Sequence, residues 1–189
     1  RLDFKYDHQG RRVEKRVTDL DATEVLARRY VYDGWNLVAE LDGEGGAIQW
    51  SYVWGLDVTG TLTSAGGVGG LVQMTRYAAG APVESYYPTY DGSGNVMSLV
   101  KATDGSLAAV YEYDPFGGLI RHEVLDANVQ HNPFRFATKY HDTETGLAYY
   151  GLRYYSAIMG RFVNRDPIGE SGGLNLYAFV GNNSIGRYD

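Results

Sequence analysis

Residues 87–96 read Tyr-Pro-Thr-Tyr-Asp-Gly-Ser-Gly-Asn-Val, a strand-forming run that reaches a Tyr-Asp pair and then reverses through glycines. The same order recurs at 4–13, 30–38 and 111–120. Self-similarity of this kind indicates a repeat architecture, in which each unit needs neighbours to bury its apolar face. Because Tyr favours strands and Gly supplies the positive φ of tight turns, each unit is predicted to be a β-hairpin.

Asp-Gly pairs between apolar residues predict where the chain reverses. These pairs are Asp42-Gly43, Asp91-Gly92 and Asp104-Gly105. A type I′ turn needs positive φ at both central residues, which Asp and Gly tolerate. Each Asp of a Tyr-Asp pair is expected to accept hydrogen bonds from backbone N–H groups of the following turn, and each Tyr to pack on one face of the sheet.

The composition agrees with an all-β chain of antiparallel hairpins. Among 189 residues there are 25 Gly and 17 Tyr but only 5 Pro and no Cys, which rules out disulfides and cysteine chemistry. The net charge of −6 comes from interspersed charges without a basic stripe, so nucleic acid is not an expected partner. The sequence has no long apolar run and no apolar leader, so neither a membrane span nor a signal peptide is expected.

Three stretches depart from the repeat. Residues 59–70 are Gly-rich and are predicted to form a linker or loop. Residues 18–28 fit either a short helix or a polar hairpin connection. From residue 132 onward the sequence is denser in aromatic residues, so we divide the chain into a repeat region, 1–131, and a C-terminal segment, 132–189.

The C-terminal segment carries a long ordered signature. It reads PFRFATKYHDTETGLAYYGLRYY over 133–155, GRFVNRDPIG over 160–169 and GGLNLYAFVGNN over 172–183. This closely resembles the Rhs-repeat-associated core, the C-terminal end of the Rhs/YD-repeat shell of bacterial polymorphic toxins and of the C component of insecticidal ABC toxin complexes. The Tyr-Asp hairpins that precede it resemble the repeats of the same family.

The resemblance implies that the hairpins form a curved ribbon of a hollow shell, and that the C-terminal segment spirals inward and plugs one end. The implied partners are an enclosed C-terminal toxin domain, further Rhs repeats or other copies at open sheet edges, and a secretion spike or toxin-complex component. Such a protein would be made in the cytoplasm and then secreted or delivered by a bacterial secretion system.

The resemblance also implies an aspartyl autoprotease that cuts after an Asp-Pro-x-Gly-Leu sequence, which would begin at Asp189. Two neighbouring carboxylates can share a proton and act as acid and base on a peptide bond. Asp166 matches the family's Arg-Asp-Pro motif and is the first candidate, and Arg165 could orient it. Asp189 could be the second carboxylate or part of the substrate only. The alternative for both is an ordinary turn residue.

Other acids are weaker candidates for the second carboxylate, because residues 177–186 contain none, whereas some toxin-complex relatives place an Asp there. These candidates are Asp142, Glu144 and Glu170. Without a scissile bond of its own, the chain is expected to be an incomplete peptidase. The alternative function is a passive adhesion, carbohydrate-binding or partner-binding module without catalysis.

Metal and cofactor chemistry is not expected. The four histidines lie on separate repeats or connections, and none has the spacing of a metal motif. They are His8, His122, His131 and His141.

Overall fold

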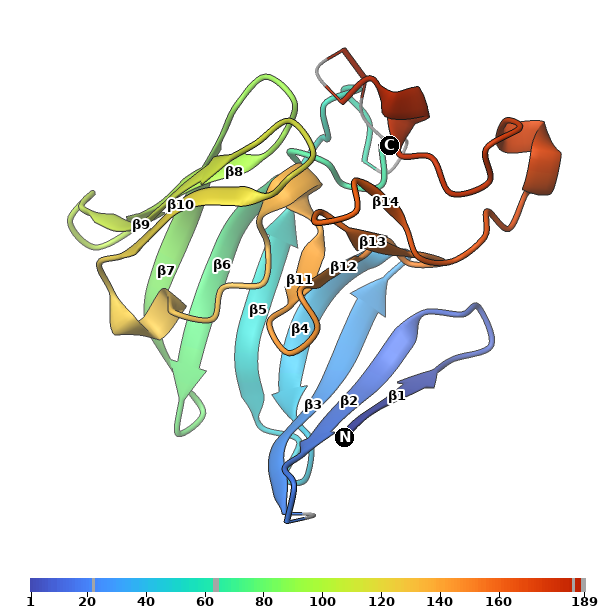
Figure 1. Cartoon of the computed structure of the whole chain (residues 1–189). Coiled ribbons are helices and arrows are strands. Elements are labelled where there is room, and N and C mark those ends of the chain that lie inside the picture. The colour runs from blue at the N-terminus through green and yellow to red at the C-terminus, as the bar shows by residue number, and fades with distance from the viewer. Residues whose placement is uncertain (22, 63–64, 185, 188–189) are drawn as a thin grey trace.

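The structure, a computed structural model, describes residues 1–21, 23–62, 65–184 and 186–187. Its main element is one antiparallel sheet whose ten strands follow the order of the chain (Figure 1). The strands are β1 Leu2–Tyr6, β2 Arg12–Thr18, β3 Glu24–Asp33, β4 Asn36–Asp42, β5 Ile48–Trp54, β6 Leu71–Ala78, β7 Ala81–Tyr90, β8 Val96–Lys101, β9 Leu107–Tyr113 and β10 Leu119–Val124. The prediction of an all-β hairpin ribbon is confirmed.

A second, smaller antiparallel sheet follows in the C-terminal segment. Its four strands are β11 Tyr140–Asp142, β12 Leu147–Tyr149, β13 Tyr154–Ser156 and β14 Arg161–Phe162. Single 3-10 turns lie around them: η1 Ala127–Val129, η2 Phe136–Thr138, η3 Gly169–Gly172 and η4 Val180–Asn182. Figure 1 shows the large sheet curving around this segment, so the ribbon has an inner face that its own C-terminal part covers.

Aromatic side chains of alternate strand positions form the core on that inner face. Tyr30, Tyr52, Tyr86 and Tyr111 are each at most 5% exposed. Phe134 comes from the C-terminal segment and meets Tyr52 edge to face, with ring centroids 4.9 Å apart. The predicted packing of strand tyrosines on one sheet face is therefore confirmed for these residues, and the two regions of the chain share a core.

The turns after three of the four predicted Tyr-Asp units follow one pattern, whereas Asp33 faces Asn36 across the two-residue connection between β3 and β4. Asp91 accepts backbone hydrogen bonds at Oδ1 from Ser93 (2.9 Å) and Asn95 (3.0 Å), and its C=O accepts from the N–H of Gly94 (3.2 Å). Gly94 has φ +77°, a conformation that L side chains rarely adopt. The glycine that the turn requires is thus the third residue after the Asp. The same arrangement occurs at Asp7 with Gly10 and at Asp114 with Gly117.

The Asp-Gly hairpin turns lie where the sequence predicted them, between β4 and β5, β7 and β8, and β8 and β9. The predicted type I′ geometry is wrong. The glycines with positive φ in these three connections are Gly46, Gly94 and Gly105, and no Asp among them has positive φ. The connections are longer than the two residues of a type I′ hairpin. In each of them the Asp carboxylate accepts hydrogen bonds from backbone N–H groups of the turn.

For two other stretches the structure decides between the alternatives that the sequence left open. Residues 59–70, of which 63 and 64 lie outside the described residues, belong to a packed loop, because Val68 is fully buried and Asp57 accepts backbone hydrogen bonds from Thr59 and Ala65. Residues 18–28, apart from 22, contain the end of β2 and the start of β3. The helical alternative is therefore wrong, and the hairpin connection is correct.

Candidate functional site

The C-terminal segment is held to the inner face of the ribbon by buried charges. Asp142, at the end of β11, is fully buried and accepts from Arg12 Nη1 at 2.5 Å and Lys15 Nζ at 2.9 Å. Lys15 Nζ also donates to Glu144 at 2.6 Å. Arg12 and Lys15 belong to β2, so this ion network joins residues about 130 positions apart. We call these four residues the clasp.

Aromatic rings surround the guanidinium of Arg12. Its Cζ lies 4.7–5.2 Å from four ring centroids, those of Phe4, Tyr30, Tyr140 and Tyr149. Burial disfavours the charge of Arg12, yet the neighbouring Tyr30 and Asp142 raise its pKa well above the usual value. Asp142 and Glu144 therefore serve as counter-ions in the clasp, which leaves them poor candidates for a second catalytic carboxylate.

Asp166 lies in the turn between β14 and η3 of the C-terminal segment. Its Oδ1 accepts from the N–H of Ile168 at 3.0 Å, and its C=O accepts from the N–H of Gly169 at 3.1 Å. Gly169 has φ +62°, so this turn shares with the ribbon turns a left-handed Gly and an Oδ1 contact to the N–H two residues after the Asp. The geometry is that of a turn-capping Asp whose side chain is 18% exposed.

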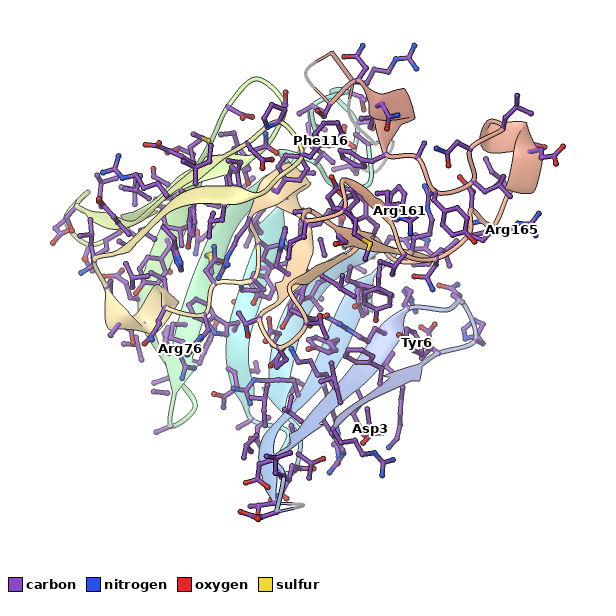
Figure 2. All side chains as sticks on the ribbon, viewed as in Figure 1. Asp3, Tyr6, Arg76, Phe116, Arg161 and Arg165 are labelled. Atoms are coloured by element: carbon purple, nitrogen blue, oxygen red, sulfur yellow. The ribbon has the colours of Figure 1, made fainter. Side chains whose placement is uncertain are left out.

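The other oxygen of Asp166 has a specific cationic partner. Arg153 Nη1 donates to Asp166 Oδ2 at 2.9 Å, and its guanidinium stacks 3.6 Å above the ring centroid of Phe162. The pairing expected of Arg165 is made by Arg153 instead. Arg165 is exposed on the loop after β14 (Figure 2). Sequence reasoning missed Arg153, because thirteen residues separate it from Asp166.

Two candidates remain for a carboxylate beside Asp166. Asp189 lies outside the described residues. Glu170 is exposed in η3. Across the described ranges, no group of three or more His, Asp and Glu side chains could hold a metal ion.

A cavity of about 230 Å³ opens beside the clasp, between β2–β5 and the β11–β12 hairpin, and both apolar and charged side chains line it. Glu40, at 4% exposure, accepts from the hydroxyl of Tyr52 at 2.6 Å, and burial raises the pKa of Glu40. His141 also lines it, and burial lowers the pKa of this imidazole to about 4. The sequence signals neither residue, because each looks like an ordinary residue of an alternating strand.

Comparison with known proteins found relatives of this chain but no family model that matches it. Three of these relatives carry names that state a function. The tRNA nuclease WapA of Bacillus subtilis (strain 168) is 29% identical over 98% of the chain. Double-stranded DNA deaminase toxin A of Burkholderia cenocepacia is 29% identical over 95% of it. Toxin subunit YenC2 of Yersinia entomophaga is 40% identical over 51% of it.

Solved structures agree with these sequence matches. The crystal structure of TcdB2-TccC3 superposes on the whole chain with a TM-score of 0.75 at 24% identity. The chain resembles the Rhs-type shell proteins of toxin complexes. The Photorhabdus luminescens Tc holotoxin pore also covers the whole chain, with a TM-score of 0.74 at 22% identity.

The chain corresponds to a small part of these proteins. It spans 7% of WapA, 13% of the deaminase toxin, 10% of YenC2 and 9% of the TcdB2-TccC3 chain. In the described part of the chain, no helix has both the length and the apolar character needed to cross a membrane.

Proposed function

We propose that this chain forms part of the wall of an Rhs-type shell that encloses a C-terminal toxin domain, with residues 132–189 as the inward-turned closing segment. The observation that carries this proposal is the clasp, which fixes β11 to the inner face of the ribbon through buried charges. A segment held in this way occupies the space that the curved sheet surrounds. Two relatives are named as toxins and a third as a tRNA nuclease, and the chain spans 13% or less of each, which supports a guest domain encoded elsewhere in a parent protein.

The proposed partners follow from the same reasoning. The guest is the toxin domain, further Rhs repeats extend the wall, and a toxin-complex component or secretion spike carries the shell out of the producing cell. Limited proteolysis of a parent protein tests the enclosure. A protease should cut the guest domain faster when Asp142→Asn weakens the clasp, and at the unchanged rate when exposed Asp3→Asn is substituted. Equal guest cleavage in all three proteins would contradict enclosure by this segment.

We also propose that Asp166 is one carboxylate of a self-cleaving aspartyl peptidase. One acid of such a pair takes a proton from the attacking water, while the other donates a proton to the carbonyl oxygen of the scissile bond. The turn amide at Oδ1 and Arg153 at Oδ2 fix the orientation of Asp166. Asp189 is the proposed second acid or the residue that begins the substrate sequence.

The cleavage proposal is tested in a parent protein that continues through Asp-Pro-x-Gly-Leu into a downstream domain. Asp166→Asn keeps the side-chain size and the turn hydrogen bond but cannot ionise. It should slow cleavage by about 10²- to 10⁴-fold. Glu170→Gln, on the exposed η3 turn, should leave the rate unchanged. Separation of the Asp166→Asn protein into two bands at the wild-type rate on a denaturing gel would refute the role.

A second candidate function is a scaffold without catalysis. One observation favours it: Oδ1 of Asp166 caps the N–H two residues later, as Oδ1 of Asp91 does in the ribbon, where no chemistry is proposed. In that case Asp166→Asn and Asp91→Asn should have similar effects on stability, and neither should change the cleavage of a parent protein.

A further inference from the structure

The last strand of the ribbon, β10, has one open edge. It pairs with β9 on one side and is the terminal strand of the large sheet as described. All six of its residues, Leu119–Val124, are exposed, including Ile120 at 69%. An exposed edge strand with apolar side chains is a template for pairing with another strand.

The backbone geometry shows which groups of β10 face that open edge. Just past the strand, the N–H of Leu125 donates to the C=O of Ala108 on the β9 side at 2.8 Å. Peptide groups alternate in direction along an antiparallel strand. The N–H and C=O of Glu123 therefore point toward β9, where Glu123 is the register partner of Val110. Those of His122 point toward the open edge.

The sequence of β10 is complementary to itself around His122. Arg121 and Glu123 flank this residue with opposite charges. In an antiparallel pair of two β10 strands centred on His122, Arg121 of each copy lies opposite Glu123 of the other copy. The same register places Val124 opposite Ile120, so that apolar side chains meet as well.

The present positions of these charges fit that register. Arg121 makes ion pairs of 2.9 Å with both Glu112 and Glu123, so the three charges lie together on one face of the sheet. A second copy would place its Glu123 beside Arg121 at the open edge. Across the three strands the charges would then alternate from Glu112 of β9 to Arg121 of β10 to Glu123 of the second copy. Opposite charges on directly facing strand residues stabilise such pairs, and like charges destabilise them.

We propose that two copies of this chain associate through antiparallel pairing of their β10 strands in the register centred on His122. A single pair of short strands lies in the size range of transient interfaces, below about 1,200 Å² in total. The dimer is therefore concentration-dependent. This association is independent of the proposed enclosure and cleavage.

The opposite edge, β1, provides a matched control. Its Asp3 and Lys5 also carry opposite charges, but its side chains are engaged within the chain. Phe4 stacks on Tyr154 with centroids 6.0 Å apart, and the Tyr6 hydroxyl lies 2.7 Å from that of Tyr154. We therefore expect Lys5→Glu to leave the association unchanged.

Sedimentation equilibrium over a range of concentrations tests the register. Arg121→Glu alone and Glu123→Arg alone each place like charges opposite one another twice, so each should weaken dimerisation by at least about tenfold. An equimolar mixture of the two variants restores opposite charges at both positions and should dimerise. Far-ultraviolet circular dichroism checks that each variant is folded.

Three results would overturn the proposal. They are a wild-type chain that stays monomeric up to its solubility limit, single variants that dimerise like wild type, and a mixture that stays monomeric when wild type dimerises. Hydrogen exchange in a parent protein adds a fourth. If the His122 amide is protected while the parent is monomeric, a strand of the same chain covers the edge, and pairing between copies is refuted.

Discussion

The clasp should contribute a large share of the stability of the fold, and Asp142→Asn tests this directly. The substitution keeps the volume of the side chain but removes the charge that compensates Arg12 and Lys15. The side chains of these two residues are only 1% and 4% exposed, so water cannot replace the lost carboxylate. Removal of one partner of a buried ion pair costs about 3–5 kcal/mol.

The expected loss lies near the lower end of that range. Lys15 retains Glu144, and Arg12 retains the four rings around it. A loss of about 3 kcal/mol is still a large part of the 5–15 kcal/mol that typically stabilises a domain. The assay is urea unfolding followed by tryptophan fluorescence, with the midpoints and slopes compared between variants.

A second substitution separates buried charge from packing. In the double variant Arg12→Met, Asp142→Leu, the uncompensated charge is gone and apolar volume replaces it. Such replacements of buried ion pairs are often neutral or stabilising. The double variant should therefore unfold at higher urea than Asp142→Asn alone.

The exposed pair of Arg1 and Asp3 provides the control for this series, since their side chains are 79% and 45% exposed. Asp3→Asn should shift the urea midpoint several-fold less than Asp142→Asn. The reasoning would be refuted if the two single variants unfolded at the same urea concentration. It would also be refuted if the double variant were the least stable of all.

Three further predictions concern single positions. Gly94→Ala should destabilise the chain by more than about 1 kcal/mol, because φ is +77° and a Cβ would lie 2.5 Å from Cγ1 of Val68. Gly92→Ala is the control, since a Cβ there meets nothing within 4 Å. Thermal unfolding compares the two variants. His141 has a pKa lowered by burial from 6.5 to about 4, so the stability gained by keeping its ring neutral is present above pH 6.5 and lost as the pH falls toward 4. Urea unfolding of His141→Gln should lack this part of the acid sensitivity, and an unchanged pH profile would contradict it. Burial raises the pKa of Glu40, so its ionised form destabilises the folded chain at high pH. Glu40→Gln should therefore raise the urea midpoint at pH 8 and raise it much less at pH 4. Equal midpoint shifts at the two pH values would contradict a destabilising charge at Glu40.

The ribbon could be predicted from the sequence because its signals are local. A Tyr-Asp pair, a short turn and the next strand lie within about ten residues, so each unit can be recognised without knowledge of distant contacts. The position of the required glycine was misread for the same local reason. In residues 91–95 the Asp-Gly pair stands out, but the carboxylate of Asp91 spans the turn, and the left-handed position is Gly94.

The clasp and the partner of Asp166 could not be predicted, because their residues are brought together only by the tertiary fold. Arg12 and Lys15 look like surface charges on a strand, and Asp142 looks like a turn residue. Nothing in a single sequence pairs residues 130 positions apart. Arg165 was chosen to orient Asp166 because it is adjacent in sequence, but adjacent side chains in an extended stretch point in different directions. Arg153 reaches the carboxylate from the turn before β13.

The separation of the clasp residues also has a consequence for synthesis. Arg12 leaves the ribosome about 130 residues before Asp142, a delay of roughly 10 s at ordinary translation rates. During that time the first hairpin carries two cations on a surface that is destined for burial, without their main counter-ion. That corner of the sheet is therefore completed late, and the ribbon closes over its interior only after β11 has been made. A nascent chain that stops before β11 lacks Asp142, so Arg12 and Lys15 remain without this counter-ion.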